Sequence, residues 1–401
     1  MKILIAWELG HGLGHITQLQ PFIEGFISKG YDVHLVASEL HNIRNFFDID
    51  KIQFYQSPVS FRPPIIEKNK PTISWPDFCL SIYQEDSSLI GIVKSWESLF
   101  KLIKPDLVIF DQSPSCMIAS LNHHFLKWII GTPFSIPRAD FLPFGAYPIV
   151  SDINKNTDKF LEKENLFLQK VNSLLEELKL HQINKLNSLF EQMDKTFLSI
   201  IPEFDVYGIR QEVDYLSFPP QPKIKNLFNF NWPDNFDNKI FFYLQPFPGC
   251  ETFLAALEEI HLYAVIYSSS LKEEFQKKFK KHIFVDSAVD MNFVYQTAEV
   301  IIHLGGPNVG SKCILNGIPQ IVFPSTVDHT LSTISLNKLG PVAIMKQNQS
   351  REYYIEKLKN IKPKIGLPIK KSSFNSSLLN GEAYLENVEN LLNDFSIKKD
   401  I

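Results

Sequence analysis

Two histidines in this sequence stand where a short apolar run meets a glycine-rich turn. His15 closes the turn at residues 9–15, directly after the apolar run 2–7, and His303 opens a similar turn after the run 300–303. An imidazole can take a proton from a hydroxyl group near neutral pH, and a glycine turn before a helix exposes amides that suit a phosphate. The residue types therefore predict proton transfer at the first turn and anion binding at the second.

Asp111 is the acid that the sequence best pairs with His15. It ends the apolar run 104–111, so it is expected at the carboxyl end of a strand, the same sheet edge as His15. A carboxylate bonded to one imidazole nitrogen fixes the tautomer and stabilises the imidazolium that forms. The residues alone also allow plainer interpretations, in which His15 caps a helix and Asp111 caps a turn.

The first turn differs from a dinucleotide-binding fingerprint. That fingerprint has a third glycine where this chain has His15, so NAD is not expected. Gly12 and Gly14 still let the backbone approach a ligand closely, and we predict them as ligand contacts.

The second turn contains a larger set of candidate anion-binding residues. A strand, a glycine turn and a helix follow one another, and amides at such a helix start suit a diphosphate. His303 could donate to a phosphate oxygen, and after the strand 320–323 an acid could hold sugar hydroxyls, although His329 alone could be an ordinary loop residue. The candidates are His303, Gly305, Gly306, Asn308, Val309, Gly310, Ser311, Asp328 and His329.

Alternating strands and helices in both halves of the chain must position these residues. Strands are predicted at 2–7, 31–37, 104–111, 239–244, 264–267, 282–285, 300–303 and 320–323, with a long helix at 166–189 and a last helix at 381–395. The proline- and asparagine-rich stretch 221–238 is predicted to be a linker. The fold class is thus α/β, with two Rossmann-like, doubly wound parallel sheets.

Composition excludes several classes of partner. The 401 residues have a net charge of −4 and no basic tract, so nucleic acid is not expected. No segment approaches the roughly 20 apolar residues of a membrane span, and the start of the chain lacks the features of a signal peptide. Four scattered cysteines indicate reduced thiols in a cytoplasmic protein. Asp48 and Asp50 resemble a metal-binding pair, but their setting indicates a turn.

The two motifs together resemble the inverting family 1 glycosyltransferases of GT-B fold, the UDP-glycosyltransferase-like enzymes, and more distantly the MurG-type enzymes. The stretch 12–15, with the helix after it and residues 29–33, looks like that family's opening. The stretch from His303 through Gly305, Gly306 and Asp328 looks like its donor-binding signature. The resemblance covers nearly the whole chain and is weakest at 61–99 and 151–199.

The resemblance implies a bacterial, cytoplasmic hexosyltransferase whose two domains face each other across a cleft. The family's catalytic histidine falls on His15 and its partner aspartate on Asp111. A single displacement would move a sugar from a UDP- or dTDP-linked donor to an acceptor hydroxyl. No metal and no bound cofactor are implied, because helix amides neutralise the diphosphate.

Further roles follow from the same resemblance. The implied domains are an acceptor-binding domain at 1–220, the linker at 221–238, a donor-binding domain at 239–380, and a helix at 381–401 that could pack back on the first domain. Donor contacts are expected at Gln245, Ala288 and Val289. The acceptor, a small molecule, lipid or glycan, could meet Phe134, Phe141 and Phe144, or these rings could simply pack in the core. Peripheral membrane contact through this segment is the other possibility.

The chain also departs from the family pattern. It has His329 where the family usually has glutamine, and Ser311-Lys312 where the signature helix usually carries a glutamate. Lys312 either adds a positive charge for the donor or is simply solvated. Two further functions stay open: a sugar-nucleotide epimerase of the same fold, and a non-catalytic glycan- or partner-binding protein.

Overall fold

The chain divides into two compact units. Unit 1 comprises residues 1–223 and 381–401, and unit 2 comprises residues 224–380. The computed structural model describes residues 1–10, 12–41, 43–59, 72–141, 143–149, 156–221, 227–228, 230–243, 245–268, 273–340, 342–362 and 381–397. Parts of the predicted linker (222–226) and of the predicted donor domain (363–380) lie outside the described residues.

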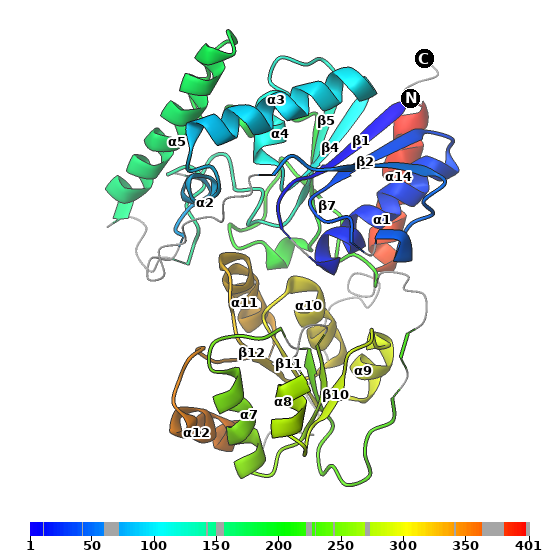
Figure 1. The fold of residues 1–401 in the computed structure, drawn as a ribbon, viewed down its shortest axis with the longest axis vertical. Coiled ribbons are helices and arrows are strands. Elements are labelled where there is room, and N and C mark those ends of the chain that lie inside the picture. Colours follow the sequence, from blue (N-terminus) through cyan, green and yellow to red (C-terminus); the bar gives the residue numbers. More distant parts are fainter. Residues whose placement is uncertain are drawn as a thin grey trace. The chain divides into compact units, whose positions relative to one another are not determined.

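Unit 1 is built on a sheet of seven parallel strands (Figure 1). Their order is β3-β2-β1-β4-β5-β6-β7, so the direction of winding reverses between β1 and β4. The central strands β1 and β4 are buried, and they are apolar except for Lys2 at the start of β1 and Asp111 at the end of β4, as expected for strands covered on both faces. The strands are β1 (Lys2–Trp7), β2 (Asp32–Ala37), β3 (Ile52–Gln56), β4 (Leu107–Asp111), β5 (Leu126–Gly131), β6 (Lys195–Leu198) and β7 (Asp214–Tyr215).

Helices cover the sheet of unit 1, and the two that matter most for the site are α1 and α14. They are α1 (Leu13–Ser28), α2 (Trp75–Ile82), α3 (Asp86–Ile103), α4 (Pro114–Ala119), α5 (Thr157–Glu177), α6 (Ser188–Glu191) and α14 (Glu382–Ile397), with short 3-10 turns η1 (Ile43–Asn45) and η3 (Pro202–Phe204). Alternate side chains of β1, such as Ile3 and Ile5, share one core cluster with α1 and α14.

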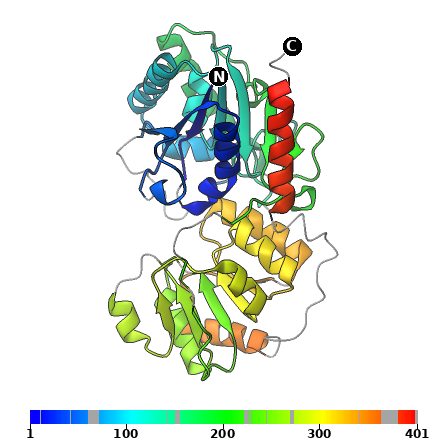
Figure 2. The same ribbon diagram turned by 90° about the vertical axis from the view of Figure 1, so that its right-hand side faces the viewer.

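Helix α14 comes from the end of the chain and packs alongside α1 (Figures 1 and 2). Gly25 makes the close approach possible, because a Cβ there would lie 2.2 Å from Leu392 Cδ1. Tyr384 Oη donates to the carbonyl of Gln18 at 2.7 Å. The C-terminal helix is therefore part of the core of unit 1, and it supports the helix that carries His15.

The predicted helix 166–189 was wrong in its extent. Helix α5 runs from Thr157 to Glu177. Lys179 has a left-handed φ of 57°, and the amide of Leu180 bonds back to Leu175, so the chain turns away from the helix axis. The side chain of Asn172 then binds both the amide and the carbonyl of Ile183. The left-handed Lys179 thus ends the helix, although apolar residues continue at helical spacing beyond it.

Unit 2 repeats the same architecture with six parallel strands in the order β10-β9-β8-β11-β12-β13. Its winding reverses between β8 and β11. The strands are β8 (Ile240–Tyr243), β9 (Ala264–Tyr267), β10 (Ile283–Val285), β11 (Val300–His303), β12 (Gln320–Val322) and β13 (Val342–Ile344). The helices are α7 (Cys250–Glu259), α8 (Glu273–Lys278), α9 (Met291–Thr297), α10 (Pro307–Asn316), α11 (Val327–Leu339) and α12 (Arg351–Ile361). Two parallel α/β units confirm the predicted fold class.

In the predicted linker, the described residues 227–228 and 230–238 belong to unit 2, whereas Gln221 belongs to unit 1. Phe228 pairs with Val289 as an isolated parallel bridge, and Phe230 packs on the core cluster around Phe241. Trp232 Nε1 donates to Thr297 Oγ1 at 2.9 Å. Phe230 and Trp232 are half-buried in unit 2, whereas Phe228 is 45% exposed. The packing of these two rings overrides the polar, proline-containing composition.

Three other observations bear on the sequence predictions. All four cysteines are free and buried. Asp48 Oδ1 accepts the amide of Asp50, which makes this pair a turn. Within the described ranges, no helix is long and apolar enough to cross a membrane, and no group of three or more His, Cys, Asp and Glu could hold a metal ion.

Candidate active site

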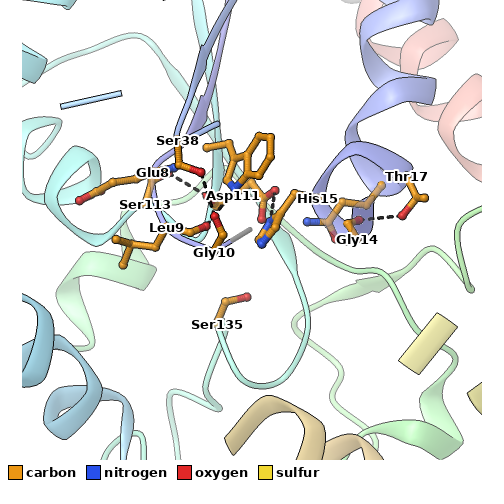
Figure 3. Close-up of polar contacts among 12 residues, drawn as sticks. Glu8, Leu9, Gly10, Gly14, His15, Thr17, Ser38, Asp111, Ser113 and Ser135 are labelled. Atoms are coloured by element: carbon orange, nitrogen blue, oxygen red, sulfur yellow. Dashed lines mark hydrogen bonds and ion pairs between the residues drawn. The ribbon is translucent and has the colours of Figure 1, made fainter. Parts of the chain in front are cut away.

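His15 and Asp111 meet at the winding reversal of the unit 1 sheet. Asp111 is the last residue of β4, and His15 is the third residue of α1, the helix that follows β1. Nδ1 of His15 lies 2.8 Å from Oδ2 of Asp111 (Figure 3). Asp111 is 1% exposed and the His15 side chain 16%. The fold therefore brings into contact the two residues that the sequence pattern pairs.

The contact with Asp111 sets the tautomer of the neutral imidazole. A carboxylate only accepts hydrogen bonds, so a neutral ring bonded to it carries its proton on Nδ1. The ring also stacks on Trp7, with centroids 4.9 Å apart and planes at 21°. Trp7 is the register partner of Asp111 in the sheet. His15 is thus held from two sides.

Gly10 is required by this arrangement. Its φ of +86° suits glycine, and a Cβ added there would lie 2.3 Å from His15 Nε2. Gly12 is the N-cap of α1 with φ +90°, and its amide is 3.5 Å from Glu39 Oε2. A Cβ on Gly14 would touch nothing within 4 Å, so space does not demand glycine there.

A buried carboxyl group, Glu8, lies next to this pair. Its oxygens accept hydrogen bonds from the Oη of Tyr83 (2.5 Å), the Oγ of Ser115 (2.6 Å), and the amides of Ser115 (3.0 Å) and Cys116 (3.3 Å). The amide of Glu8 in turn donates to Ser113 Oγ at 3.1 Å (Figure 3). Burial raises the pKa of Glu8 to about 7, although these donors oppose the shift. Glu8 joins the turn after β1 to the segment after β4.

The second candidate constellation forms around the turn after β11 in unit 2, where the ring of His303 has partners within the protein. Nδ1 of His303 accepts the amide of Gly305 at 3.1 Å, and Nε2 lies 2.9 Å from Gln320 Oε1. Both ring nitrogens are thus engaged, and the ring is 1% exposed. Burial lowers the pKa of His303 to about 4, and the nearby His329 acts in the same direction. The imidazole shapes the turn, and its role as a phosphate donor stays a prediction.

Gly305 is the position in this turn that requires glycine. Its φ is +101°, and a Cβ would lie 2.7 Å from Thr333 Oγ1 and 3.0 Å from the carbonyl of His329. The turn therefore packs directly against α11.

Helix α10 begins at Pro307 with Gly306 as its N-cap. The amide of Gly310, predicted as a phosphate donor, already bonds to the carbonyl of Gly306 at 3.1 Å. Ser311 is fully buried, and its Oγ donates to the carbonyl of Asn308. Among the described residues, the amides of Gly306 and Val309 have no hydrogen-bond acceptor. These two are the amides at the helix start that a ligand could use.

Asp328 and His329 lie in the first turn of α11. The N-cap Thr326 accepts the amide of His329 at 3.1 Å, and His329 Nδ1 lies 2.8 Å from Ser325 Oγ. An acid in the first turn suits the positive end of a helix. Burial lowers the pKa of His329, and the charge of Asp328 opposes this effect. Both side chains are half-buried within the same unit as the Gly305 turn.

The remaining predicted donor contacts are Gln245, Ala288 and Val289, none of which has a side chain that ionises. The carbonyl of Ala288 accepts the amide of Phe228 at 2.7 Å, and Val289 is 5% exposed in the core. Gln245 is exposed, two residues after β8.

The aromatic residues predicted to line an acceptor pocket serve mainly as core. Phe134 stacks on Tyr147, and Phe144 meets Trp75 edge-on. Phe134 is 9% exposed and Phe144 is 3% exposed, which fits the packing alternative. Phe141 is half-buried against Tyr207.

Sequence reasoning missed Trp7 and Glu8 as parts of the first site. A usable signal was present, because Trp7 ends the first strand and Glu8 follows it directly, at the sheet edge where ligands of such folds bind. Glu8 is also an acid directly after a run of buried apolar residues, where an acid needs partners or a raised pKa.

Comparisons with known proteins concern the fold. No protein-family model matches this sequence, and no curated protein matches it by sequence. Solved structures do match over nearly the whole chain. The glycosyltransferase of kitacinnamycin has 12% identity and a TM-score of 0.61, covering 98% of this chain and 95% of that one.

Two further structures agree. The calicheamicin glycosyltransferase CalG4 has 12% identity and a TM-score of 0.61, with 98% and 94% of the two chains covered. The spinosyn rhamnosyltransferase SpnG, complexed with thymidine diphosphate, has 11% identity and a TM-score of 0.54, with 98% and 96% covered. The chain therefore has the fold of GT-B glycosyltransferases, as its sequence predicts.

Proposed function

We propose that this protein transfers a sugar from a nucleotide diphosphate sugar to an acceptor hydroxyl, with inversion at the anomeric carbon. The observation that carries the proposal is the contact of 2.8 Å between His15 and Asp111 at the winding reversal of the unit 1 sheet. Ligands of open α/β sheets bind at that position. The fold shared with glycosyltransferases supports the same reaction class, although fold alone does not determine function.

The first step of the proposed reaction is removal of a proton by His15. The acceptor hydroxyl donates to Nε2, and its oxygen attacks the anomeric carbon as the proton moves to the ring. The bond from that carbon to the diphosphate oxygen breaks, and the nucleoside diphosphate leaves with the electron pair. Asp111 stabilises the imidazolium through Nδ1, and Trp7 keeps the ring plane fixed. One displacement gives inversion.

Unit 2 supplies the donor site in this proposal. The amides of Gly306 and Val309, at the start of α10, bind the diphosphate. Asp328 and His329 contact the sugar, and the nucleobase lies near Ala288. His303 contributes by holding Gly305 in its left-handed conformation. Helix amides take the role that a metal has in other transferases, so we propose a metal-independent reaction without a bound cofactor.

The donor is proposed to be UDP- or dTDP-linked, because one matched structure is a complex with thymidine diphosphate. The acceptor is a small molecule, lipid or glycan, and we place the reaction in the bacterial cytoplasm. Phe141 is the residue from the predicted acceptor group that is exposed enough to meet an acceptor.

Thermal stability measured against a panel of nucleoside diphosphates and their sugars tests the donor class. A ligand at about 100 times its dissociation constant should stabilise the folded state by about 2.7 kcal/mol. Product analysis should then show transfer only when an acceptor is added, with the opposite anomeric configuration. An epimerised donor formed without acceptor would replace the proposal by an epimerase, and binding without any turnover would indicate a non-catalytic protein.

A further inference from the structure

Lys312 is a buried lysine in the donor-binding segment. It is the only lysine or arginine between residues 303 and 329, and it is the sixth residue of α10. The residue is 7% exposed, so the interpretation of Lys312 as simply solvated is wrong. Lysine is almost never this buried unless its charge is paired.

The charge of Lys312 has no pair in the part of the chain that the structure describes. Its ammonium group makes no hydrogen bond or ion pair with any described residue. Helix α10 packs against α9 and α11. The titratable groups there and at the N-cap of α9 are Asp290, Tyr295, Asp328, His329 and Lys338. None of them contributes to the lowered pKa of Lys312, whose cause is burial alone.

Burial lowers the pKa of Lys312 to about 8. The side chain therefore still carries its proton in most molecules at pH 7. A largely buried charge without a partner destabilises the fold unless an anion compensates it. An arrangement of this kind favours binding of an anion from solution.

Helix geometry directs the side chain toward the start of α10. Side chains on a helix lean toward its N-terminus and cover the preceding turn. Asn308 is four residues before Lys312, about 6 Å along the helix axis. The four-carbon stem of lysine spans that distance. The ammonium group can therefore reach the level of the unbonded amide of Val309.

His303, the other candidate side chain at this turn, supplies no positive charge to the site. His303 is neutral, and both of its ring nitrogens are engaged. The amide of Gly310 is bonded within the helix cap. When the bond from the anomeric carbon breaks, the leaving diphosphate gains one negative charge, and its phosphate oxygens need donors or cations. We infer that Lys312 is the cation that binds the diphosphate of the nucleotide donor at the start of α10, an inference that rests on the proposed function.

Calorimetry with UDP, dTDP, inorganic pyrophosphate and uridine tests this assignment. Changing Lys312 to methionine should weaken binding of the three phosphate ligands by roughly 10- to 100-fold, the effect of losing one charge-assisted hydrogen bond. Uridine has no phosphate, so any binding of uridine should be unchanged. Lys338→Met, at an exposed lysine in the last turn of α11, is the matched control and should leave every affinity unchanged.

Two further readouts separate this role from a structural one. An anion beside Lys312 raises its pKa, so diphosphate binding at pH 8 should take up protons in the wild type and not in Lys312→Met. The unliganded methionine variant should unfold at the same temperature as the wild type or higher, because it lacks a buried charge. A lysine with a merely structural role would instead lower the unfolding temperature on replacement.

The outcomes distinguish failure of the role assigned to Lys312 from failure of the proposed function. If the diphosphates bind both proteins equally and with equal proton uptake, Lys312 does not bind the diphosphate, although the proposed function stands. If the wild type binds no nucleoside diphosphate and no pyrophosphate, the ligand class is wrong, and both proposals fail.

Discussion

Replacing Glu8 by glutamine isolates the effect of burying an acid beside the active site. Glu8 is 2% exposed and accepts four hydrogen bonds from Tyr83, Ser115 and Cys116. Glutamine keeps the size of the side chain but does not titrate. The pH dependence that disappears with the substitution is therefore the contribution of the carboxyl group.

The size of this pH-dependent change in stability follows from the raised pKa of Glu8. Burial raises the pKa of Glu8 from 4.5 to about 7. Between these values the folded protein keeps a proton that the unfolded chain has released. The stability from the protonated form is thus fully present below pH 4.5 and is lost as the pH rises through about 7. At about 1.36 kcal/mol for each pKa unit, the loss is about 3 kcal/mol.

Urea unfolding from pH 5 to pH 8, followed by tryptophan fluorescence, measures this term. Four of the five tryptophans report on unit 1, namely Trp7, Trp75, Trp96 and Trp128. The free energy of unfolding of the wild type, relative to Glu8→Gln, should fall as the pH rises. Tyr83→Phe removes a donor to the carboxylate and should move the fall to higher pH. A difference that grows with pH would refute the reasoning, because it would mean that the hydrogen bonds outweigh burial.

Two other substitutions probe the pairing of the imidazole and the support from the last helix. Asp111→Asn should reduce the turnover rate by roughly 10²–10⁴-fold with little change in donor affinity, since the amide does not stabilise the imidazolium of His15. Asp106→Asn, just before the start of β4, is the control. Equal turnover rates for the two variants would contradict the pairing of Asp111 with His15. Leu392→Ala should lower the free energy of unfolding by about 2–5 kcal/mol, because a buried side chain of α14 is lost. The exposed Leu385→Ala should change it by less than about 0.5 kcal/mol, and comparable losses in both would mean that α14 does not pack as described.

The sequence predicted the parts of the fold that depend on local pattern. Apolar runs located the central strands, and β11 begins and ends at the predicted residues. The order of motifs indicated two parallel α/β units. Asp111 was chosen because it ends an apolar strand, and parallel strands end at one sheet edge, so its contact with His15 followed from topology.

Other features depend on tertiary contacts that a pattern does not contain. His303 has a residue type that could bind phosphate, but Gln320, on the neighbouring strand β12, engages its ring. Lys312 looked solvated because lysine usually is, whereas its place on α10 buries it. Phe144 belongs to the core because Trp75 lies against it. The predicted helix 166–189 ended early at the left-handed Lys179, a residue whose type gives no signal of a turn.

The central claim is that His15 removes the proton from the acceptor. The direct test compares wild type with His15→Ala, once a donor and an acceptor have been found, by measuring the transfer rate and the donor dissociation constant on the same preparations. The account predicts a loss of roughly 10²–10⁴-fold in rate with donor affinity nearly unchanged. An unchanged rate, or a loss of donor binding that explains the whole effect, would contradict it.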